Sequence, residues 1–214
     1  MALVLYMHPL SSYCQKALIA LYENETPFEA KVVNLGDEAE RDAFKKVWPL
    51  AKFPVLRDHA RGFTVPESTA VIEYLDVHHR GRTRFIPADP DMAWQTRMRD
   101  RFFDFYVNDP MGRIVGDRIR PADKRDPYGV EQAKGLLRTA YAVIDEEMKS
   151  RTWAMGDAFS MADCAAAPAL FYADKVLPFG EHANVTAYFA RLLARPSYAR
   201  AIAEAEPYFA LFPK

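Results

Sequence analysis

Strand-like and helix-like segments occupy different parts of this chain, and the change falls near residue 80. Before that point, short β-type runs alternate with stretches of helical spacing. Beyond it, the apolar residues recur only at helical spacing. Strands that alternate with helices predict a layered α/β domain, and an unbroken series of helices predicts an all-α domain. A length of 214 residues suits two such domains.

The order predicted for the first part is β-α-β-α-β-β-α. Strands are expected at residues 3–6, 28–33, 54–57 and 63–65, and the last two flank a polar turn and should form a hairpin. Helices are expected around Cys14, Leu18 and Leu21, over residues 38–47, and from Ser68 to His78. This alternation favours a sheet with a parallel portion, to which the hairpin adds an antiparallel edge.

The second part is predicted to be helical throughout. Residues 81–90 are polar and contain proline, so they are expected to link domain 1–80 to domain 91–214. Pro168 is expected to kink one of the helices, and residues 111–127 are expected to form a flexible stretch. The helices are expected at residues 93–107, 128–149, 162–177, 184–193 and 197–204.

Charge and cysteine usage narrow the function classes. The formal net charge is -1, which gives no reason to expect nucleic acid or an anionic membrane as a partner. No apolar run approaches the ~20 residues that span a bilayer, and the first residues lack the basic lead of a signal peptide. Cys14 and Cys164 show no disulfide framework. These features together predict a cytoplasmic protein with free thiols.

The first candidate for chemistry is the segment from Ser11 to Cys14, between the first strand and the first helix. Serines there are natural N-caps. A helix N-terminus also offers unpaired N–H groups and partial positive charge, which suit an anion such as a thiolate. A serine hydroxyl can donate a hydrogen bond to the same sulfur. Alone, this segment is more typical of a plain helix cap.

Two further candidates lie at strand and helix starts. If the Phe53–Pro54 bond is cis, the backbone of Phe53 is free to pair with an extended peptide; an ordinary trans proline is the alternative. Ser68 is expected to be the N-cap of the third helix and to present its N–H and hydroxyl to a carboxylate. Glu67 beside it can pair with an ammonium. Together these two would suit an amino-acid head group, although alone they also fit a simple cap.

Other polar patterns predict structure or exclude chemistry. Ser160 and Asp163 form a capping box, and loss of either side chain is expected to cost about 1 kcal/mol. The chain has no phosphate-binding glycine loop. No metal site is expected, because no histidine pair has ligand spacing. The histidines are His8, His59, His78, His79 and His182.

Taken together, the motifs resemble the cytosolic glutathione transferase family, in its bacterial type with a serine-dependent active loop. The resemblance covers nearly the whole chain and implies a thioredoxin-like N-terminal domain followed by an all-α domain. Four motifs in the same order carry it. They are residues 5–16 (LYMHPLSSYCQK), 48–56 (WPLAKFPVL), 66–75 (PESTAVIEYL) and 156–163 (GDAFSMAD).

The resemblance implies that glutathione is the co-substrate and that Ser11 is the catalytic serine, with Ser12 as second candidate. Two departures from the family pattern stand out. Trp48 occupies a position where asparagine often precedes the proline. Serine at position 11, with Cys14 only later, disfavours the branch of the family that uses a cysteine nucleophile.

By the same resemblance, Phe53 and Pro54 hold the cysteinyl backbone, and Glu67 and Ser68 hold the γ-glutamyl end. Lys52 is implied near the glycine carboxylate. The bound thiolate would attack an electrophile, in a pocket expected between the domains, and a homodimer is expected from the resemblance alone. The residues expected to line that pocket are Leu10, Phe103, Tyr106, Met111 and Phe171.

Three alternatives remain open at this stage. The first is a glutathione-dependent isomerase or reductive dehalogenase on the same fold, because fold does not fix the reaction. The second is a non-catalytic binding protein that keeps the shape. The third is a thiol oxidoreductase that uses Cys14, although its place on an apolar stripe predicts a buried and inert thiol.

Overall fold

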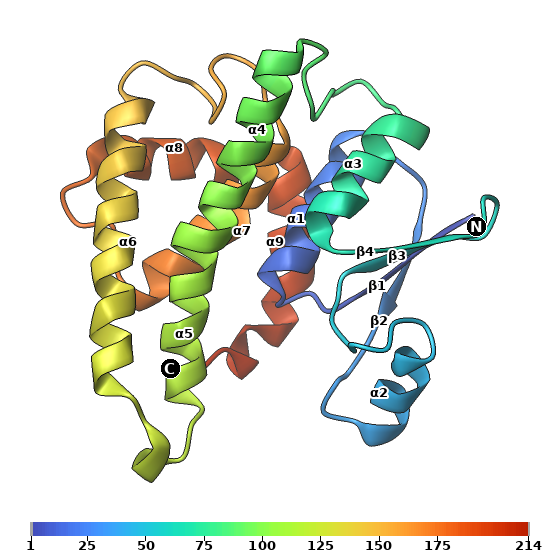
Figure 1. Ribbon diagram of the computed structural model, residues 1–214, viewed down its shortest axis with the longest axis horizontal. Helices are drawn as coiled ribbons and strands as arrows, with labels where there is room; N and C mark the ends of the chain where they lie inside the picture. The colour runs from blue at the N-terminus through green and yellow to red at the C-terminus, as the bar shows by residue number, and fades with distance from the viewer. Residues whose placement is uncertain (1, 214) are drawn as a thin grey trace. The chain divides into compact units, whose positions relative to one another are not determined.

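The computed structural model describes residues 2–213 (Figure 1). The chain forms two compact units. One consists of the chain up to Phe85 together with Pro196–Phe209. The other consists of Ile86–Arg195 together with the residues after Phe209. No helix within residues 2–213 combines the length and the apolar character needed to cross a membrane.

The first unit is built on a four-stranded sheet in the order β2-β1-β3-β4. β1 pairs with β2 in parallel and with β3 antiparallel, and β3 pairs antiparallel with β4. The predicted element order, the parallel portion and the hairpin are therefore confirmed. The strands are β1 (Leu3–Met7), β2 (Glu29–Val32), β3 (Val55–Asp58) and β4 (Phe63–Pro66).

Helices cover both faces of this sheet. The ring of Tyr6 on β1 stacks on Phe44 of α2 (Glu38–Lys45), with ring centroids 5.6 Å apart. Successive side chains of a strand point to opposite faces, so the buried Leu5 and Met7 lie on the other face. There α1 (Ser12–Glu23) packs against α3 (Ser68–His78), and Figure 1 shows both helices across the sheet from α2.

The first unit also contains the last long helix of the chain. α9 (Pro196–Ala205) packs along α1. The hydroxyl of Tyr22 donates to Glu204, and the hydroxyl of Ser197 donates to Glu23 at 2.8 Å. Ser197 and Glu23 are 174 positions apart in the sequence. Nothing in the sequence pattern indicates that their helices pair.

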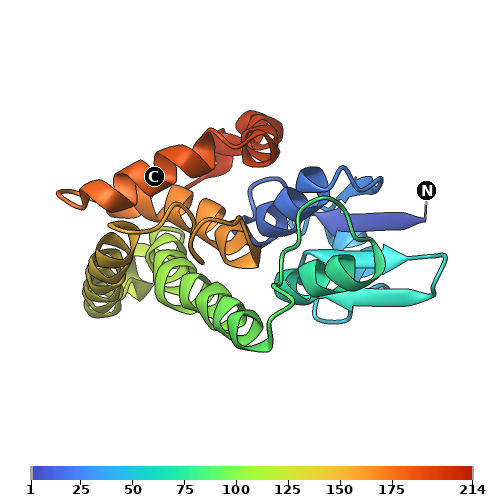
Figure 2. The ribbon, with the colours of Figure 1, turned by 90° about the horizontal axis from the view of Figure 1, so that it is seen from above.

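The second unit is helical, as predicted (Figure 2). Two local corrections apply. Residues 93–107 were expected to be one α-helix, but Phe103–Asn108 forms a π-helical segment. Residues 111–127 were expected to be flexible, yet the first half belongs to a helix. The elements are α4 (Pro90–Phe102), the π-helical segment, α5 (Asp109–Arg118), a 3₁₀ turn (Ala122–Lys124), α6 (Pro127–Met148), α7 (Met161–Val176) and α8 (Ala183–Leu193).

The start of α7 confirms the predicted capping box. The backbone N–H and the hydroxyl of Ser160 donate to Asp163 at 2.9 and 3.0 Å. The structure adds two donors from outside the motif: the N–H of Ala154 at 2.8 Å and the hydroxyl of Tyr188 at 2.7 Å. Asp163 is fully buried. It therefore joins a loop and α8 to the helix that forms the core of the second unit.

Candidate functional site

The loop between β1 and α1 places Ser11 at the helix N-cap. Ser11 has extended backbone angles, and its Oγ accepts the N–H of Cys14 at 3.3 Å. The expected cap is therefore confirmed. A serine hydroxyl can accept and donate at the same time, so the Ser11 hydrogen is still able to bond a ligand atom. Ser12 is the first helical residue, and both serines are half-buried.

Cys14 lies in the first turn of α1 and has no exposed surface. Burial raises the pKa of its thiol to about 12, although a hydrogen bond with the Ser11 side chain acts in the opposite direction. The thiol is therefore protonated at neutral pH. Because the thiolate is the reactive form of cysteine, this burial removes the basis for an oxidoreductase that uses Cys14.

The peptide bond between Phe53 and Pro54 is cis. Of the two alternatives that the sequence left open at this proline, the structure has the cis form. The strand ladders begin only at Val55, which pairs with Pro66 and with Tyr6. The backbone of Phe53 therefore lies outside these ladders, immediately before them.

The start of α3 differs from the expectation. The N-cap is Glu67, not Ser68, and no side chain caps this helix. Ser68 is the first helical residue and is buried. Glu67 has φ 69°, a region that non-glycine residues seldom adopt and that costs of order 1–3 kcal/mol. The first N–H groups of α3 are consequently left for another acceptor.

These segments meet around one pocket in the first unit, with a volume of about 190 Å³. All five residues predicted to bind glutathione line it, although they come from two separate segments of the chain. The lining residues are Tyr13, Lys52, Phe53, Pro54, Glu67 and Ser68. Ser11 and Ser12 do not line it, but Tyr13 of the same helix turn does. Nothing in the sequence indicates Tyr13, because a tyrosine after two serines carries no signal of its own.

His8 is not indicated by the sequence either, because its contacts with other rings arise only on folding. Its ring stacks on Phe53, with centroids 6.2 Å apart, and its carbonyl oxygen accepts the N–H of Ser11 at 3.0 Å. Burial lowers the pKa of His8 below its ordinary value of 6.5. Within residues 2–213, no group of three or more His, Cys, Asp or Glu side chains could hold a metal ion.

Trp48, one of the two departures from the family pattern, packs against the apolar cluster below the sheet. That cluster is formed by Val33, Phe44 and Val55. The backbone N–H of Trp48 donates to the carbonyl of Phe44 at 2.9 Å. The tryptophan thus packs the segment before Pro54 against α2 and buries apolar surface there.

The residues expected to line an electrophile pocket have different environments. In the second unit, Phe103 and Met111 are buried, at 2% and 6% exposure, and belong to the core of that unit. Tyr106 is 53% exposed, on the π-helical segment, and Phe171 of α7 is half-buried. In the first unit, Leu10 is half-buried in the loop before α1. Their grouping in one pocket stays a prediction.

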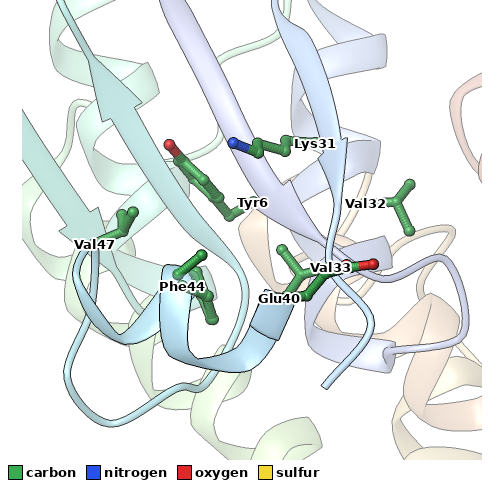
Figure 3. A pocket seen from close by; sticks show the side chains of 8 residues that line it. Tyr6, Lys31, Val32, Val33, Glu40, Phe44 and Val47 are labelled. Atoms are coloured by element: carbon green, nitrogen blue, oxygen red, sulfur yellow. The ribbon is translucent and has the colours of Figure 1, made fainter. Parts of the chain in front are cut away.

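A second pocket, of about 100 Å³, lies between α2 and the edge of the sheet (Figure 3). Figure 3 shows Tyr6 and Lys31 side by side on the strands, and Phe44 and Val47 opposite them. The Lys31 ammonium lies 5.3 Å from the centre of the Tyr6 ring. A lysine on an exposed edge strand is a common device against strand pairing, so this pocket does not indicate a peptide site.

The described geometry agrees with the comparisons to known proteins. Residues 5–83 match the family model of the glutathione S-transferase N-terminal domain, and residues 127–191 match that of the C-terminal domain. The glutathione S-transferase GstB of Escherichia coli K12 is 24% identical over 194 residues, covering 90% of this chain and 93% of the relative. The dichloromethane dehalogenase of Methylorubrum extorquens is 29% identical over 215 residues, covering 94% and 74%.

Solved structures give the same answer. A glutathione S-transferase of Methylobacterium radiotolerans, crystallised with glutathione sulfonate, superposes with a TM-score of 0.81 at 28% identity, covering 93% of each chain. The chain belongs to the glutathione S-transferase family. The predicted fold class, a thioredoxin-like domain with a helical domain, is thereby confirmed; dependence on a serine is not tested by these likenesses.

Proposed function

We propose that this protein is a glutathione transferase that binds glutathione in the 190 Å³ pocket and adds its thiolate to a hydrophobic electrophile. The observation that carries the proposal is the convergence of Phe53–Pro54 and Glu67–Ser68 on one pocket beside the start of α1. The uncapped start of α3 supplies N–H groups for the γ-glutamyl carboxylate. The exposed Glu67 carboxylate pairs with its ammonium group, and Lys52 with the glycine carboxylate.

The thiol is activated at the start of α1. A free thiol of this kind has a pKa near ~8.5, so a shift of two units requires about 2.7 kcal/mol of preference for the thiolate. A hydrogen bond from the Ser11 hydroxyl to the charged sulfur contributes ~1.5–3 kcal/mol, and the helix terminus adds ~0.3–1 kcal/mol. These two sources are sufficient, so no separate general base is needed.

Titration of bound glutathione tests this assignment, with the thiolate absorbance as the readout. Ser11→Ala should raise the pKa of the bound thiol by one to two units at ~1.36 kcal/mol per unit, and Ser12→Ala should leave it unchanged. Calorimetry with reduced glutathione is run on both variants as the control for binding. An unchanged titration in Ser11→Ala, with a raised pKa in Ser12→Ala, would transfer the role to Ser12. Absence of glutathione binding by the wild type would refute the transferase proposal altogether.

A dehalogenase activity is the second candidate, favoured by the 29% identity to the dichloromethane dehalogenase. Both reactions begin with the same thiolate and differ in the leaving group. A panel with a chloronitrobenzene, a dihaloalkane and a cis–trans isomerisable substrate separates conjugation, dehalogenation and isomerisation. Retention on immobilised glutathione without turnover of any of these would instead support a non-catalytic binding protein.

Apolar surface on α4 supports a homodimer, which the family resemblance led us to expect. Trp94 and Met98 of α4 are one helical turn apart and 53% and 52% exposed, and Phe105 on the π-helical segment is 60% exposed. Large exposed apolar side chains that gather in this way are typical of protein–protein interfaces. Sedimentation of the wild type and of Trp94→Glu tests the dimer: the wild type should sediment as a dimer and the variant as a monomer.

A further inference from the structure

His8 connects the loop that carries Ser11 to the segment that precedes Pro54. Its ring stacks on Phe53 with an interplanar angle of 20°, and the ring of Tyr208 contacts it edge-on, with centroids 5.1 Å apart. Tyr208 lies in the 3₁₀-helical segment Glu206–Leu211 that follows α9. The imidazole therefore contacts two aromatic rings that lie far apart in the sequence of the first unit.

The same residue makes two hydrogen bonds inside its own loop. Its Nδ1 accepts the N–H of Leu10 at 3.3 Å, and its carbonyl oxygen accepts the N–H of Ser11 at 3.0 Å. These bonds fix the direction in which the chain leaves β1 and enters α1. His8 thus contacts both the loop that carries Ser11 and the ring of Phe53, the two residues to which the proposed function assigns the sulfur and the cysteinyl backbone.

We propose that His8 is a positioning residue for bound glutathione, which holds the Ser11 loop and Phe53 at a fixed separation and does so only while its ring is uncharged. This inference rests on the proposed function of the pocket. His8 itself takes no part in the chemical step.

The dependence on charge follows from the hydrogen bond to Leu10. Nδ1 can accept an N–H only as a neutral nitrogen, which assigns the ring proton to Nε2. A protonated ring would place an N–H against the N–H of Leu10, and this bond would be lost. Because burial lowers the pKa of His8 from its ordinary 6.5, the bond is present at neutral pH and is lost only as the pH falls through this lowered pKa.

Burial is the cause that acts on the pKa of His8, and among residues 2–213 no acidic side chain stabilises the protonated ring. Of the two rings that contact His8, Phe53 carries no ionisable group and Tyr208 carries a phenol hydroxyl. On the side of its own loop, the titratable side chain that bonds to the loop residues His8 and Ser11 is the protonated thiol of Cys14. The charged residues adjacent to the ring contacts are Lys52 before Phe53 and Glu206 two residues before Tyr208, and both are exposed.

Two substitutions test the contribution of the aromatic ring and that of the hydrogen-bond acceptor separately. His8→Phe keeps an aromatic ring between Phe53 and Tyr208 but removes the acceptor for Leu10. His8→Asn keeps a side-chain acceptor and removes the ring. Neither variant can acquire charge. His59→Asn, in the exposed turn between β3 and β4, is the matched control for loss of a histidine elsewhere in the same unit.

The experiment measures the Kd of S-methylglutathione by calorimetry between pH 5.5 and 7.5. The methylated sulfur cannot ionise, so the thiol pKa does not enter the result. We expect wild type and His59→Asn to lose affinity about two- to ten-fold as the pH falls, as the loss of one hydrogen bond predicts. His8→Phe should bind two- to ten-fold more weakly at pH 7.5, with little further change with pH. The Kd of His8→Asn at pH 7.5 should lie between those of the wild type and of His8→Phe, and it should also be insensitive to pH.

Equal affinities and equal pH dependence in wild type and in whichever His8 variants fold would overturn the inference and leave the proposed function intact. A wild type that fails to bind S-methylglutathione and reduced glutathione at any pH would instead refute the proposed function, and the inference with it. Far-ultraviolet circular dichroism identifies a variant that does not fold, in which case the other variant decides the result.

Discussion

Replacement of Asp163 by alanine should destabilise the protein far more than the loss of an ordinary helix cap. Asp163 is fully buried and accepts four hydrogen bonds at 2.7–3.0 Å. Two of the donors, Ala154 and Tyr188, lie outside the capping box that the sequence shows. The alanine variant therefore disconnects a loop and α8 from the start of α7, as well as removing the cap.

The magnitude follows from the donors left behind. A buried donor without a partner costs about 1–3 kcal/mol. The variant leaves backbone N–H groups and hydroxyls without a partner at positions that water does not reach. Four such donors, with the sum lowered by relaxation of the site, give a loss of about 3–5 kcal/mol. We expect a loss in this range, whereas a cap alone is worth about 1 kcal/mol.

Urea unfolding monitored by circular dichroism measures this loss. Ser160→Ala is the matched control, because it removes one donor and leaves Asp163 bonded to the backbone and to Tyr188. We expect the control to lose about 1 kcal/mol. If Asp163→Ala lost no more free energy of unfolding than Ser160→Ala, with an unchanged dependence of that free energy on urea concentration, the explanation by four donors would be wrong.

Three further predictions concern other residues. Glu67→Gly should raise the free energy of unfolding by about 1 kcal/mol, because glycine adopts φ 69° without strain, and should raise KM for glutathione several-fold through loss of the carboxylate; denaturation and initial rates measure the two effects. Burial acts to raise the pKa of Asp58, but hydrogen bonds from Tyr74 and His79, among others, outweigh it and hold the pKa below its ordinary 3.8. Its stabilising effect is therefore complete above about pH 4 and is lost as the pH falls further, so Asp58→Asn should cost about 1–3 kcal/mol at pH 7 and less at pH 3 in urea titrations. The buried Oδ1 of Asn108, in the π-helical segment, has no hydrogen-bond partner within residues 2–213, so Asn108→Leu should raise Tm by a few degrees in thermal melts, and an unchanged or lower Tm would indicate a partner that the fold does not reveal.

The sequence predicted most of the fold because many of its elements, such as α1 and α6, have apolar residues at a regular spacing. It failed at α5, where Gly112 and Gly116 argue against a helix, but burial of Met111 and Ile114 outweighs their low propensity. The π-helical segment before it has i→i+5 hydrogen bonds, a local change that no residue type in Phe103–Asn108 indicates. Local patterns therefore located the helices but not their irregular parts.

The residues of the candidate site could be predicted where they lie at the start of a strand or a helix. Phe53, Pro54, Glu67 and Ser68 could be named because prolines and serines at such junctions have recognisable backbone roles. The cap was assigned to Ser68 instead of Glu67, because a positive φ at glutamate has no sequence signal. His8 was missed because its role depends on contacts with rings at positions 53 and 208, which only folding brings together.

The pairing of α9 with α1 has a consequence for synthesis. The first unit is not complete when its own strands have left the ribosome, because the helix that contacts Tyr22 and Glu23 is made only after residues 86–195 of the second unit. Domains generally fold as units while the chain is being made, N-terminal regions first. In this chain, the nascent first 85 residues must wait for roughly the whole of the second unit to be translated before that face of α1 is covered.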